Sequence, residues 1–500
     1  MEPGGGKPDL FATTRSLVSF GDETGIRVPC LTIAHHPDPS RIGDVALLKD
    51  LLAGREVRLS RLEPEFRRPS AEGGRPLADP YTSRKPVTLR LGEGGGIVVE
   101  GREDGARVEL DGVTQALSFQ VGRAQLRAGA GVFLGLGGRI ILHLGTVALP
   151  YVPPVDEQYG MVGRSEALAR VRDDIRRVAD LDVPVLILGE TGSGKELVAR
   201  AIIKEGRRRD RPEVALNMAR IPASTAPSEL FGHVRGAFTD AAANKAGAFV
   251  DADGGTLFLD EVGETERAVQ GMLLRTLETG EVQPVGGSKT RKVDVRILAA
   301  TDARLGPALE QGRFSEALFN RLAGYVIRLP PLRERREDLP ILLERALSRE
   351  LRAVGAEARW RTDGAAEKCY LGAAVMTRLL TAPWDGNVRQ LNRIVQQMVI
   401  ASWDKPQLQL DEARLTIDGA AASAQGPTAI ENDAPAVSSY GPPPPGLSSV
   451  ELAERERLVQ ALVRCLGNQT HAAKECDISR STFVSRLERY AIRRPRTSEG

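Results

Sequence analysis

A glycine-rich segment between an apolar run and a helical pattern has the spacing of a phosphate-binding loop. Val185–Leu188 is apolar, the glycine-rich segment follows it, and helical periodicity begins at Leu197. The glycines let backbone N–H groups surround a phosphate, the helix N-terminus favours an anion, and Lys195 reaches the β- and γ-oxygens. The predicted ATP-binding residues are Gly189, Glu190, Thr191, Gly192, Ser193, Gly194, Lys195 and Glu196. Glu196 stands where such loops usually carry Ser or Thr.

Two adjacent carboxylates supply the second half of this candidate chemistry. The apolar run Thr256–Leu259 ends in Asp260 and Glu261. Asp260 is predicted to hold Mg²⁺, directly or through water, and Glu261 to polarise the attacking water. Acidic residues at a strand end often mark only a loop, but their combination with the glycine-rich loop favours an ATPase.

The chain divides into four segments, and the second of them must position these residues. Between 155 and 417, apolar runs alternate with helical periodicity, which predicts an α/β domain with a mostly parallel sheet. Residues 1–150 contain short alternating runs, such as Val87–Leu91, between glycine turns, which predicts a β-sandwich. Residues 418–447 are rich in Ala, Ser, Pro and Gly and are predicted to be a disordered linker. Residues 448–494 are predicted to form three helices, so the chain is expected to be multi-domain.

Composition excludes several classes of protein. A chain of 500 residues is expected to hold about three domains. The net charge of +2 means that any nucleic-acid-binding patch is local. The four cysteines form no CxxC pair, which disfavours a disulfide scaffold or a zinc ribbon. The start of the chain has no signal-peptide pattern, and no apolar run reaches the roughly 18 residues of a membrane span, so we expect a cytoplasmic protein with no membrane partner.

These features together resemble the sigma-54-dependent transcriptional activators, which are bacterial enhancer-binding AAA+ ATPases. The resemblance covers about 155–415 and 448–492, and its most specific motif is Glu229–Ala241. This motif is similar to the GAFTGA loop that contacts the sigma factor. The implied contact residues are Gly236, Ala237, Phe238 and Thr239. A phenylalanine buried in a packed turn is the alternative to an exposed contact.

The resemblance also implies roles around the nucleotide. Asn217 matches the asparagine that restrains the catalytic glutamate, here Glu261. Arg389 matches the arginine of the second sensor, near the γ-phosphate, and Val162 and Gly163 fall where the family packs the adenine. The implied cofactors are ATP and Mg²⁺, and the implied partner is sigma-54 RNA polymerase.

Three positions depart from the family pattern. Arg321 matches the second arginine finger, which acts across subunits of a homo-oligomer, expected to be a hexamer. Ser315 stands where the first finger is expected. Asp240 replaces the second glycine of the GAFTGA loop, and Asp302 replaces the usual asparagine of the first sensor. A DNA-binding regulator with an impaired ATPase therefore stays open as an alternative, as does a different P-loop motor, although Phe238 argues against the latter.

The last predicted helix has one apolar and one basic face. Phe483, Leu487 and Tyr490 recur at helical spacing and are predicted to face a core. This segment resembles a Fis-type helix-turn-helix, which implies binding to enhancer DNA, although a merely solvated basic helix is the alternative. The predicted outward, DNA-contacting residues are Arg480, Ser481, Ser485, Arg486 and Arg489.

The amino-terminal segment resembles a forkhead-associated (FHA) domain. Ser60-Arg61 and Ser83-Arg84 lie in a β-rich context and match the Arg and Ser of loops that bind phosphothreonine. The implied phosphopeptide-binding residues are Arg61, Ser83 and Arg84, and the implied partner is a phosphothreonine protein. Pro86 replaces the usual histidine, so a structural sandwich that regulates by docking alone is the alternative.

Overall fold

The chain forms two compact units, Met1–Ala424 and Gln425–Gly500. The predicted linker 418–447 and the first two predicted carboxy-terminal helices lie almost wholly outside the residues that the structure describes. The computed structural model describes residues 27–68, 73–80, 82–102, 105, 107–127, 129–148, 157–238, 241–302, 305–356, 371–403, 408–411, 455, 458, 476, 478 and 480–490.

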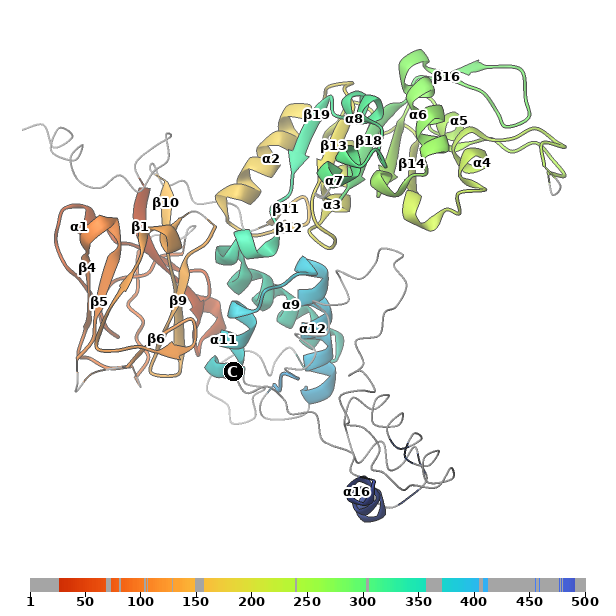
Figure 1. Cartoon of the computed structure of the whole chain (residues 1–500). Helices are drawn as coiled ribbons and strands as arrows, with labels where there is room; N and C mark the ends of the chain where they lie inside the picture. Colours follow the sequence, from red (N-terminus) through yellow and green to blue (C-terminus); the bar gives the residue numbers. More distant parts are fainter. Residues whose placement is uncertain are drawn as a thin grey trace, which may run out of the picture. The chain divides into compact units, whose positions relative to one another are not determined.

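The amino-terminal segment forms two antiparallel sheets, as its alternating runs predict (Figure 1). The first sheet has the strand order β2-β1-β10-β9-β6-β7, and the second has the order β3-β4-β5-β8. The first sheet comprises β1 (Arg27–His35), β2 (Val45–Leu47), β6 (Val108–Leu110), β7 (Val113–Thr114), β9 (Val132–Leu136) and β10 (Ile140–Ala148). The second comprises β3 (Val57–Leu59), β4 (Val87–Leu91), β5 (Ile97–Glu100) and β8 (Ser118–Val121), and α1 (Lys49–Leu52) follows β2.

One hydrophobic core lies between these two sheets. Alternate residues point to it because side chains of a strand alternate between faces. Leu31 of β1, Leu142 of β10, Leu89 of β4 and Val99 of β5 are all fully buried in this core. The segment is thus two antiparallel sheets packed on each other.

The central segment is an α/β domain with a five-stranded parallel sheet, which confirms the sequence prediction. The order is β14-β15-β18-β13-β19, and every paired neighbour runs parallel. The strands are β13 (Val185–Leu188), β14 (Glu213–Asn217), β15 (Thr256–Asp260), β18 (Arg296–Thr301) and β19 (Tyr325–Arg328). The helices are α2 (Glu166–Val178), α3 (Lys195–Glu205), α4 (Ala226–Phe231), α5 (Ala248–Asp251), α6 (Arg267–Thr279), α7 (Leu305–Glu310) and α8 (Glu316–Leu322).

Helices cover both faces of this sheet (Figure 1). On β13, Val185 and Ile187 join a core with α2 and α3, whereas Leu186 and Leu188 join a second core with α6 and α8. A parallel sheet buried on both faces reads as a continuous apolar run, which is why β13 carries four aliphatic residues in succession. Two short hairpins accompany the sheet, β11 (Glu157–Gln158) with β12 (Met161–Val162) and β16 (Glu281–Val282) with β17 (Arg291–Lys292).

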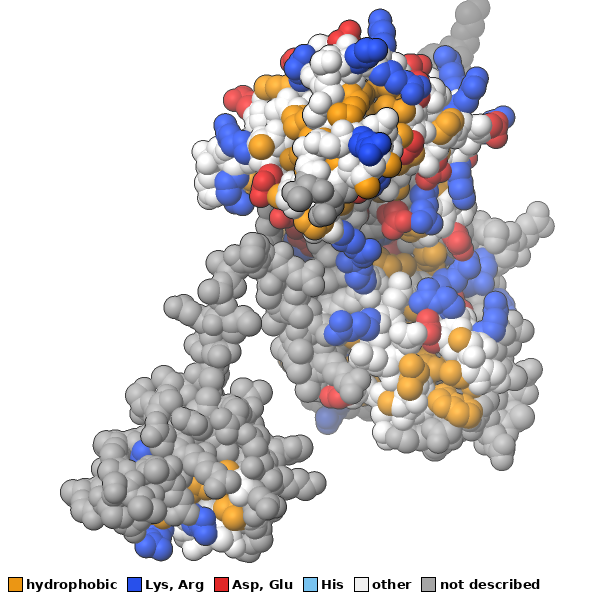
Figure 2. Space-filling model, turned by 90° about the vertical axis from the view of Figure 1, so that its right-hand side faces the viewer, with side chains coloured by type: hydrophobic (Ala, Val, Ile, Leu, Met, Phe, Trp, Pro, Cys, Tyr) orange, Lys and Arg blue, Asp and Glu red, His pale blue; other side chains and the backbone are white. Residues whose placement is uncertain are grey.

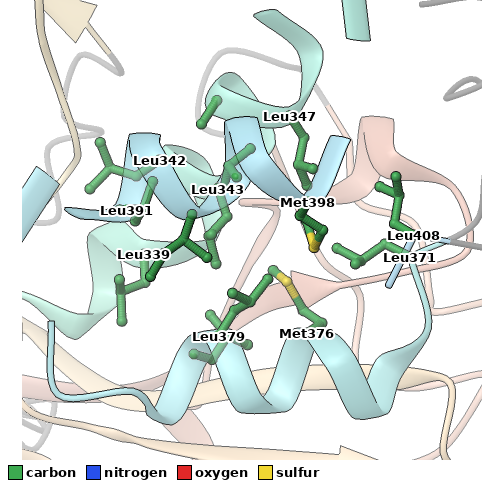
Figure 3. Close-up of a cluster of buried hydrophobic side chains, with 14 of the residues drawn as sticks. Leu339, Leu342, Leu343, Leu347, Leu371, Met376, Leu379, Leu391, Met398 and Leu408 are labelled. Carbon is green, nitrogen blue, oxygen red and sulfur yellow. The ribbon is translucent and has the colours of Figure 1, made fainter. Parts of the chain in front are cut away.

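Among the described residues, three α-helices follow the α/β domain, and we call this group the lid. They are α9 (Leu339–Ala353), α11 (Ala373–Thr381) and α12 (Asn387–Ser402). Figure 3 shows Leu343, Met376, Leu379, Leu391 and Met398 pointing toward one another between these helices. These helices therefore pack around one hydrophobic core, which residues of the amino-terminal sheet also join.

The carboxy-terminal unit contains α16 (Arg480–Arg489). Phe483, Leu487 and Tyr490 are buried, which confirms the apolar face predicted from their spacing. Ser485 and Arg489 are exposed and Arg486 is half-buried. The side chains of Arg480 and Ser481 lie outside the description.

The surface and the helices agree with the composition. Figure 2 shows basic and acidic side chains interspersed over one face of the described residues. Within the described ranges, every helix is too short or too polar to traverse a lipid bilayer.

Candidate active site

The glycine-rich loop lies at the carboxyl edge of the parallel sheet, between β13 and α3. Parallel strands end at the same edge, so the loop meets the ends of β15 and β18 there, and the Gly189 amide donates to the Thr301 carbonyl at 3.3 Å. Gly192 and Gly194 have φ values of 77° and 111°, in the region that favours glycine. A side chain at Gly192 would also place its Cβ 2.4 Å from the Gly386 carbonyl oxygen.

Lys195, at the end of this loop, faces Glu261, which directly follows β15. The Lys195 Nζ donates to the Gly189 carbonyl at 2.9 Å and lies 3.2 Å from Glu261 Oε1. Burial raises the pKa of the Glu261 carboxyl, and Asp260 and Asp302 raise it further, while Lys195 opposes the shift. Glu261 also has a left-handed backbone, with φ 52° and ψ 45°. Such strain in a non-glycine residue is concentrated at functional sites.

Asn217 has a different partner from the one that the family resemblance implies. Its Nδ2 donates to Asp260 Oδ2 at 2.9 Å, because β14 and β15 are adjacent and place Asn217 opposite Asp260. Glu261 is paired with Lys195 instead. In this structure Asn217 therefore restrains Asp260, and the expected contact with Glu261 is not made.

Two further residues bind the glycine-rich loop, and sequence reasoning did not place them in the site. They are Arg333, which precedes α9, and Asn387, which begins α12. Arg333 donates from both terminal nitrogens to the Glu190 carboxylate, each at 2.7 Å. Asn387 is fully buried, and its Nδ2 contacts Glu190 Oε2 and the Thr191 carbonyl, both at 3.2 Å. Arg333 lies in a run of charged residues that is typical of a solvated face, so only the tertiary fold reveals its partner.

The remaining predicted nucleotide residues lie around the same loop. Arg389 is exposed, and its amide donates to the Gly192 carbonyl at 3.4 Å. Val162 packs at the edge of the lid core. Gly163 has φ 143°, and a Cβ there would lie 2.5 Å from the Asp338 carboxyl carbon, so this position requires glycine. Glu196 points to solvent and pairs with Arg200 at 2.6 Å.

The predicted finger residue lies away from this loop within one chain. Arg321 is exposed on α8, and its Nε and Nη2 donate to the Leu277 carbonyl at 3.0 and 2.6 Å. Ser315 is the N-cap of the same helix, and its Oγ accepts from the Leu318 amide at 3.4 Å. The residue that replaces the first finger thus has a structural use in positioning α8.

The predicted sigma-factor loop exposes its aromatic residue. Phe238 is 45% exposed, and its ring lies edge-on to His233 with 4.8 Å between centroids. The Gly236 amide donates to the Ala241 carbonyl at 2.9 Å and closes the loop. Thr239 and Asp240 lie outside the described residues. The alternative of a phenylalanine buried in a packed turn does not fit this exposure.

The residues present suit a nucleotide. The Ser193 Oγ is buried in the loop and has no hydrogen-bond partner among the described residues. Lys195 is 7% exposed and brings a cation to the same place. Asp260 supplies the oxygen donors that Mg²⁺ prefers, and Mg²⁺ bound there would neutralise phosphate charge.

Comparisons with known proteins agree with this geometry. Residues 161–328 match the sigma-54 interaction domain, 333–429 the AAA+ ATPase lid domain, and 449–490 the Fis family of bacterial regulatory proteins. The DNA-binding transcriptional regulator NtrC of a Bradyrhizobium species is 39% identical over 65% of this chain and 68% of its own length. This chain belongs to the sigma-54-dependent transcriptional activators. As a member of that family it is an ATPase with a Fis-type DNA-binding domain.

Other relatives of this sigma-54 activator carry different names. The regulator ZraR of Klebsiella oxytoca is 39% identical over 66% of this chain and 69% of its own length. The nitric oxide reductase transcription regulator NorR2 of Cupriavidus necator is 38% identical, and the match spans 61% of its length. NtrX of Brucella abortus, solved in complex with ATP, shows 30% identity over 66% of this chain and 69% of its own, with a TM-score of 0.47.

Proposed function

We propose that an oligomeric ring of this protein hydrolyses ATP to remodel sigma-54 RNA polymerase and open promoters, while the carboxy-terminal domain holds enhancer DNA. The observation that carries the proposal is the exposed Phe238, on a loop between the two halves of the nucleotide site. An apolar side chain in solvent favours association, and a protein surface that buries it gains free energy.

The residues have the following proposed roles. Lys195 binds the β- and γ-phosphates and releases Glu261 when it does so, because a phosphate competes for the same ammonium. Glu261, once released, orients water and accepts its proton, and its pKa, raised by burial, strengthens it as a base. Asn217 holds Asp260 in place at the end of β15. Arg389 approaches the γ-phosphate from the lid.

DNA binding is assigned to α16. Its buried face is formed by Phe483, Leu487 and Tyr490, which leaves Arg489 and Ser485 in solvent. Arginine side chains on such a face contact phosphates and base edges of the major groove. We assign Arg480, Ser481 and Arg486 to the same contact from their place in the sequence of this helix.

The sigma-factor assignment is tested by separating two activities. Phe238→Ala should keep ATP hydrolysis near the wild-type rate, since the phenyl ring of Phe238 contacts His233 and not the glycine-rich loop. Open-complex formation with purified sigma-54 RNA polymerase should fall at least about ten-fold, the effect of about 1.4 kcal/mol. Leu181→Ala is the matched control, because Leu181 is 48% exposed and lies outside this loop. Equal promoter opening by both variants would contradict the assignment.

A phosphothreonine site in the amino-terminal segment is the second proposed function. The Arg61 amide donates to the Ser83 carbonyl at 3.3 Å, so the two loops that the FHA resemblance singles out are adjacent. The exposed Arg84 follows Ser83 directly. A guanidinium and a hydroxyl placed together are typical donors for a phosphate group. The packing of two antiparallel sheets behind these loops also supports the FHA resemblance.

A phosphothreonine peptide library, titrated against the full chain, tests this second function. Binding should require the phosphate, and Arg61→Ala and Ser83→Ala should each weaken it about ten-fold, as expected for a lost charge-assisted hydrogen bond. Arg90→Ala is the control, because Arg90 is an exposed arginine on β4 that pairs with Glu100. Absence of binding across the library would favour the docking-only alternative.

A further inference from the structure

The six-stranded amino-terminal sheet is buried on both faces. On β10, Ile140 and Leu142 point to the core between the two sheets, as alternation requires. Ile141 lies between them and points the opposite way, yet it is only 2% exposed. Phe133 on β9 also points outward and is 1% exposed. An antiparallel sheet packed on one face normally leaves the other face solvated, so a second surface covers this one.

That surface is the lid. Ala34, Phe133 and Ile141 belong to the same buried cluster as the lid residues Leu343 and Met376. Helices α9 and α11 contact strands β1, β9 and β10. A Cβ added at Gly112 would meet the Thr377 methyl group at 2.7 Å, which shows how closely the hairpin between β6 and β7 approaches α11.

One arginine anchors the contact. Arg336 donates to Asp111 Oδ1 at 3.0 Å and to the Gly131 carbonyl at 3.2 Å, and its guanidinium lies 4.9 Å from the Phe133 ring centroid. The Arg336 amide donates to the Gly129 carbonyl at 2.9 Å. The contact therefore combines an ion pair, a cation–π contact and a backbone hydrogen bond.

A second ion pair ties the first sheet to the α/β domain. Arg27 at the start of β1 contacts Glu166 at the start of α2, with 2.9 Å between Nη2 and Oε1. Glu166 Oε1 also accepts from the Ala148 amide at 3.3 Å. This end of β1 and β10 is thus tied to the α/β domain, whereas Ala34 and Ile141 near the other end meet the lid.

The segment that carries Arg336 also reaches the nucleotide loop. Arg333 pairs with Glu190, and Arg335, which is 4% exposed, donates to the Ser193 carbonyl at 3.4 Å. Within four residues of chain, Arg333 and Arg335 point to the nucleotide loop while Arg336 points to the amino-terminal sheet. The contact with the sheet and the two contacts with the nucleotide loop are therefore made by one short segment.

We propose that the outer face of β1, β9 and β10 is a docking surface for the lid of the same chain, and that residues 331–338 couple this docking to ATP binding. Docking holds Arg333 against the Glu190 carboxylate and Arg335 against the Ser193 carbonyl, and these contacts fix the shape of the loop that receives the phosphates. Docking therefore strengthens ATP binding. Coupling free energies are reciprocal, so ATP binding strengthens docking by the same factor.

A charge placed in the contact tests this proposal in the full chain. Ile141→Glu should weaken binding of a non-hydrolysable ATP analogue about five-fold or more, within the usual range of coupling between two sites. It should also speed hydrogen exchange in α11. In the wild-type protein, the analogue should slow exchange in both α11 and β9. Val98→Glu is the matched control, because Val98 points outward from the opposite sheet, is 9% exposed and lies outside the cluster shared with the lid.

A milder variant keeps the test decisive if Ile141→Glu does not fold. Asp111→Asn retains the Oδ1 that accepts from the Phe133 amide, and asparagine tolerates the φ of 48° at this position. It should weaken analogue binding in the same direction by a smaller factor. If Ile141→Glu and Asp111→Asn both bind the analogue as Val98→Glu does, the coupling is refuted. Faster exchange in α11 with unchanged affinity also refutes the coupling.

Discussion

At the scale of single residues, Glu261 and Lys195, the proposed catalytic base and the proposed phosphate-binding cation, form an ion pair with each other. Glu261 is held in a left-handed conformation and its carboxylate lies 3.2 Å from Lys195 Nζ. The ion pair spares both side chains the free-energy cost of an unpaired buried charge. In the proposed mechanism, a triphosphate competes for the lysine and frees the carboxylate, which would link ATP binding to activation through one ion pair.

Two substitutions separate nucleotide binding from hydrolysis. Lys195→Ala should lose affinity for ATP because it removes the cation beside the phosphates. Glu261→Gln should still bind ATP but lower turnover by about 10² or more, since an amide cannot accept the proton from water. Equilibrium binding and steady-state hydrolysis distinguish the two effects. Glu281→Gln, an exposed carboxylate on β16, is the control. Unchanged hydrolysis in both active-site variants would contradict the assigned roles.

Local sequence motifs predicted the type of chemistry well, but they did not predict which side chains contact each other. The glycine-rich loop and the Asp260-Glu261 pair are visible in the sequence because strand, loop and carboxylates are contiguous. The hydrogen bond between Asn217 and Asp260 was not foreseen, because register between β14 and β15 decides it. Arg333 and Asn387 were missed as site residues, because their partner Glu190 is 143 and 197 positions away along the chain.

At the scale of elements, the helix that carries the proposed finger depends on its first residue. Ser315 caps α8, and its own amide donates to the Gln270 side chain at 2.8 Å. Phe314 and Leu318 anchor the helix in the core of the sheet. The serine that replaces the expected first finger therefore fixes the start of the helix from which Arg321 projects.

Removal of this cap should lower stability without touching the nucleotide loop. Ser315→Ala should reduce the free energy of unfolding by about 1 kcal/mol, the usual effect of losing an N-cap oxygen. Ser315→Asp is the matched variant, because its carboxylate can accept from the same amide and also favours a helix N-terminus. Urea unfolding of the full chain, followed by the loss of helical signal, measures both. A stability of Ser315→Ala equal to that of the wild-type protein would argue against the cap.

Elements were predictable where periodicity is strong. The strands β13 and β15 coincide with the apolar runs named above, and β4 coincides with the alternating run Val87–Leu91. The face of α16 formed by Phe483, Leu487 and Tyr490 is buried as its spacing predicts. The lid contact of the amino-terminal sheet was not predictable. Ile141 and Phe133 extend apolar runs that also suit a sandwich core, and sequence alone does not tell which face each residue buries.

At the scale of the whole molecule, one chain does not contain the complete proposed catalytic site. Arg321 lies on α8 with its guanidinium directed to the Leu277 carbonyl of its own chain, whereas Lys195 is the first residue of α3. Arg321 is exposed, so a neighbouring subunit can receive it. This arrangement fits a ring in which each finger serves the next subunit, and turnover should then rise with protein concentration.

Mixed rings test the finger directly. Arg321→Ala should abolish hydrolysis while ATP still binds, because a finger that stabilises charge on the γ-phosphoryl oxygens contributes about 10³–10⁵ in turnover where this has been measured. Lys195→Ala subunits should also be inactive alone. When the two variants are mixed, some interfaces pair an intact Lys195 with an intact Arg321, so part of the turnover should return. Hydrolysis at several mixing ratios measures this recovery, and mass analysis verifies that mixed rings form. Mixed rings that stay inactive, together with hydrolysis by Arg321→Ala alone, would show that Arg321 does not act across the subunit boundary.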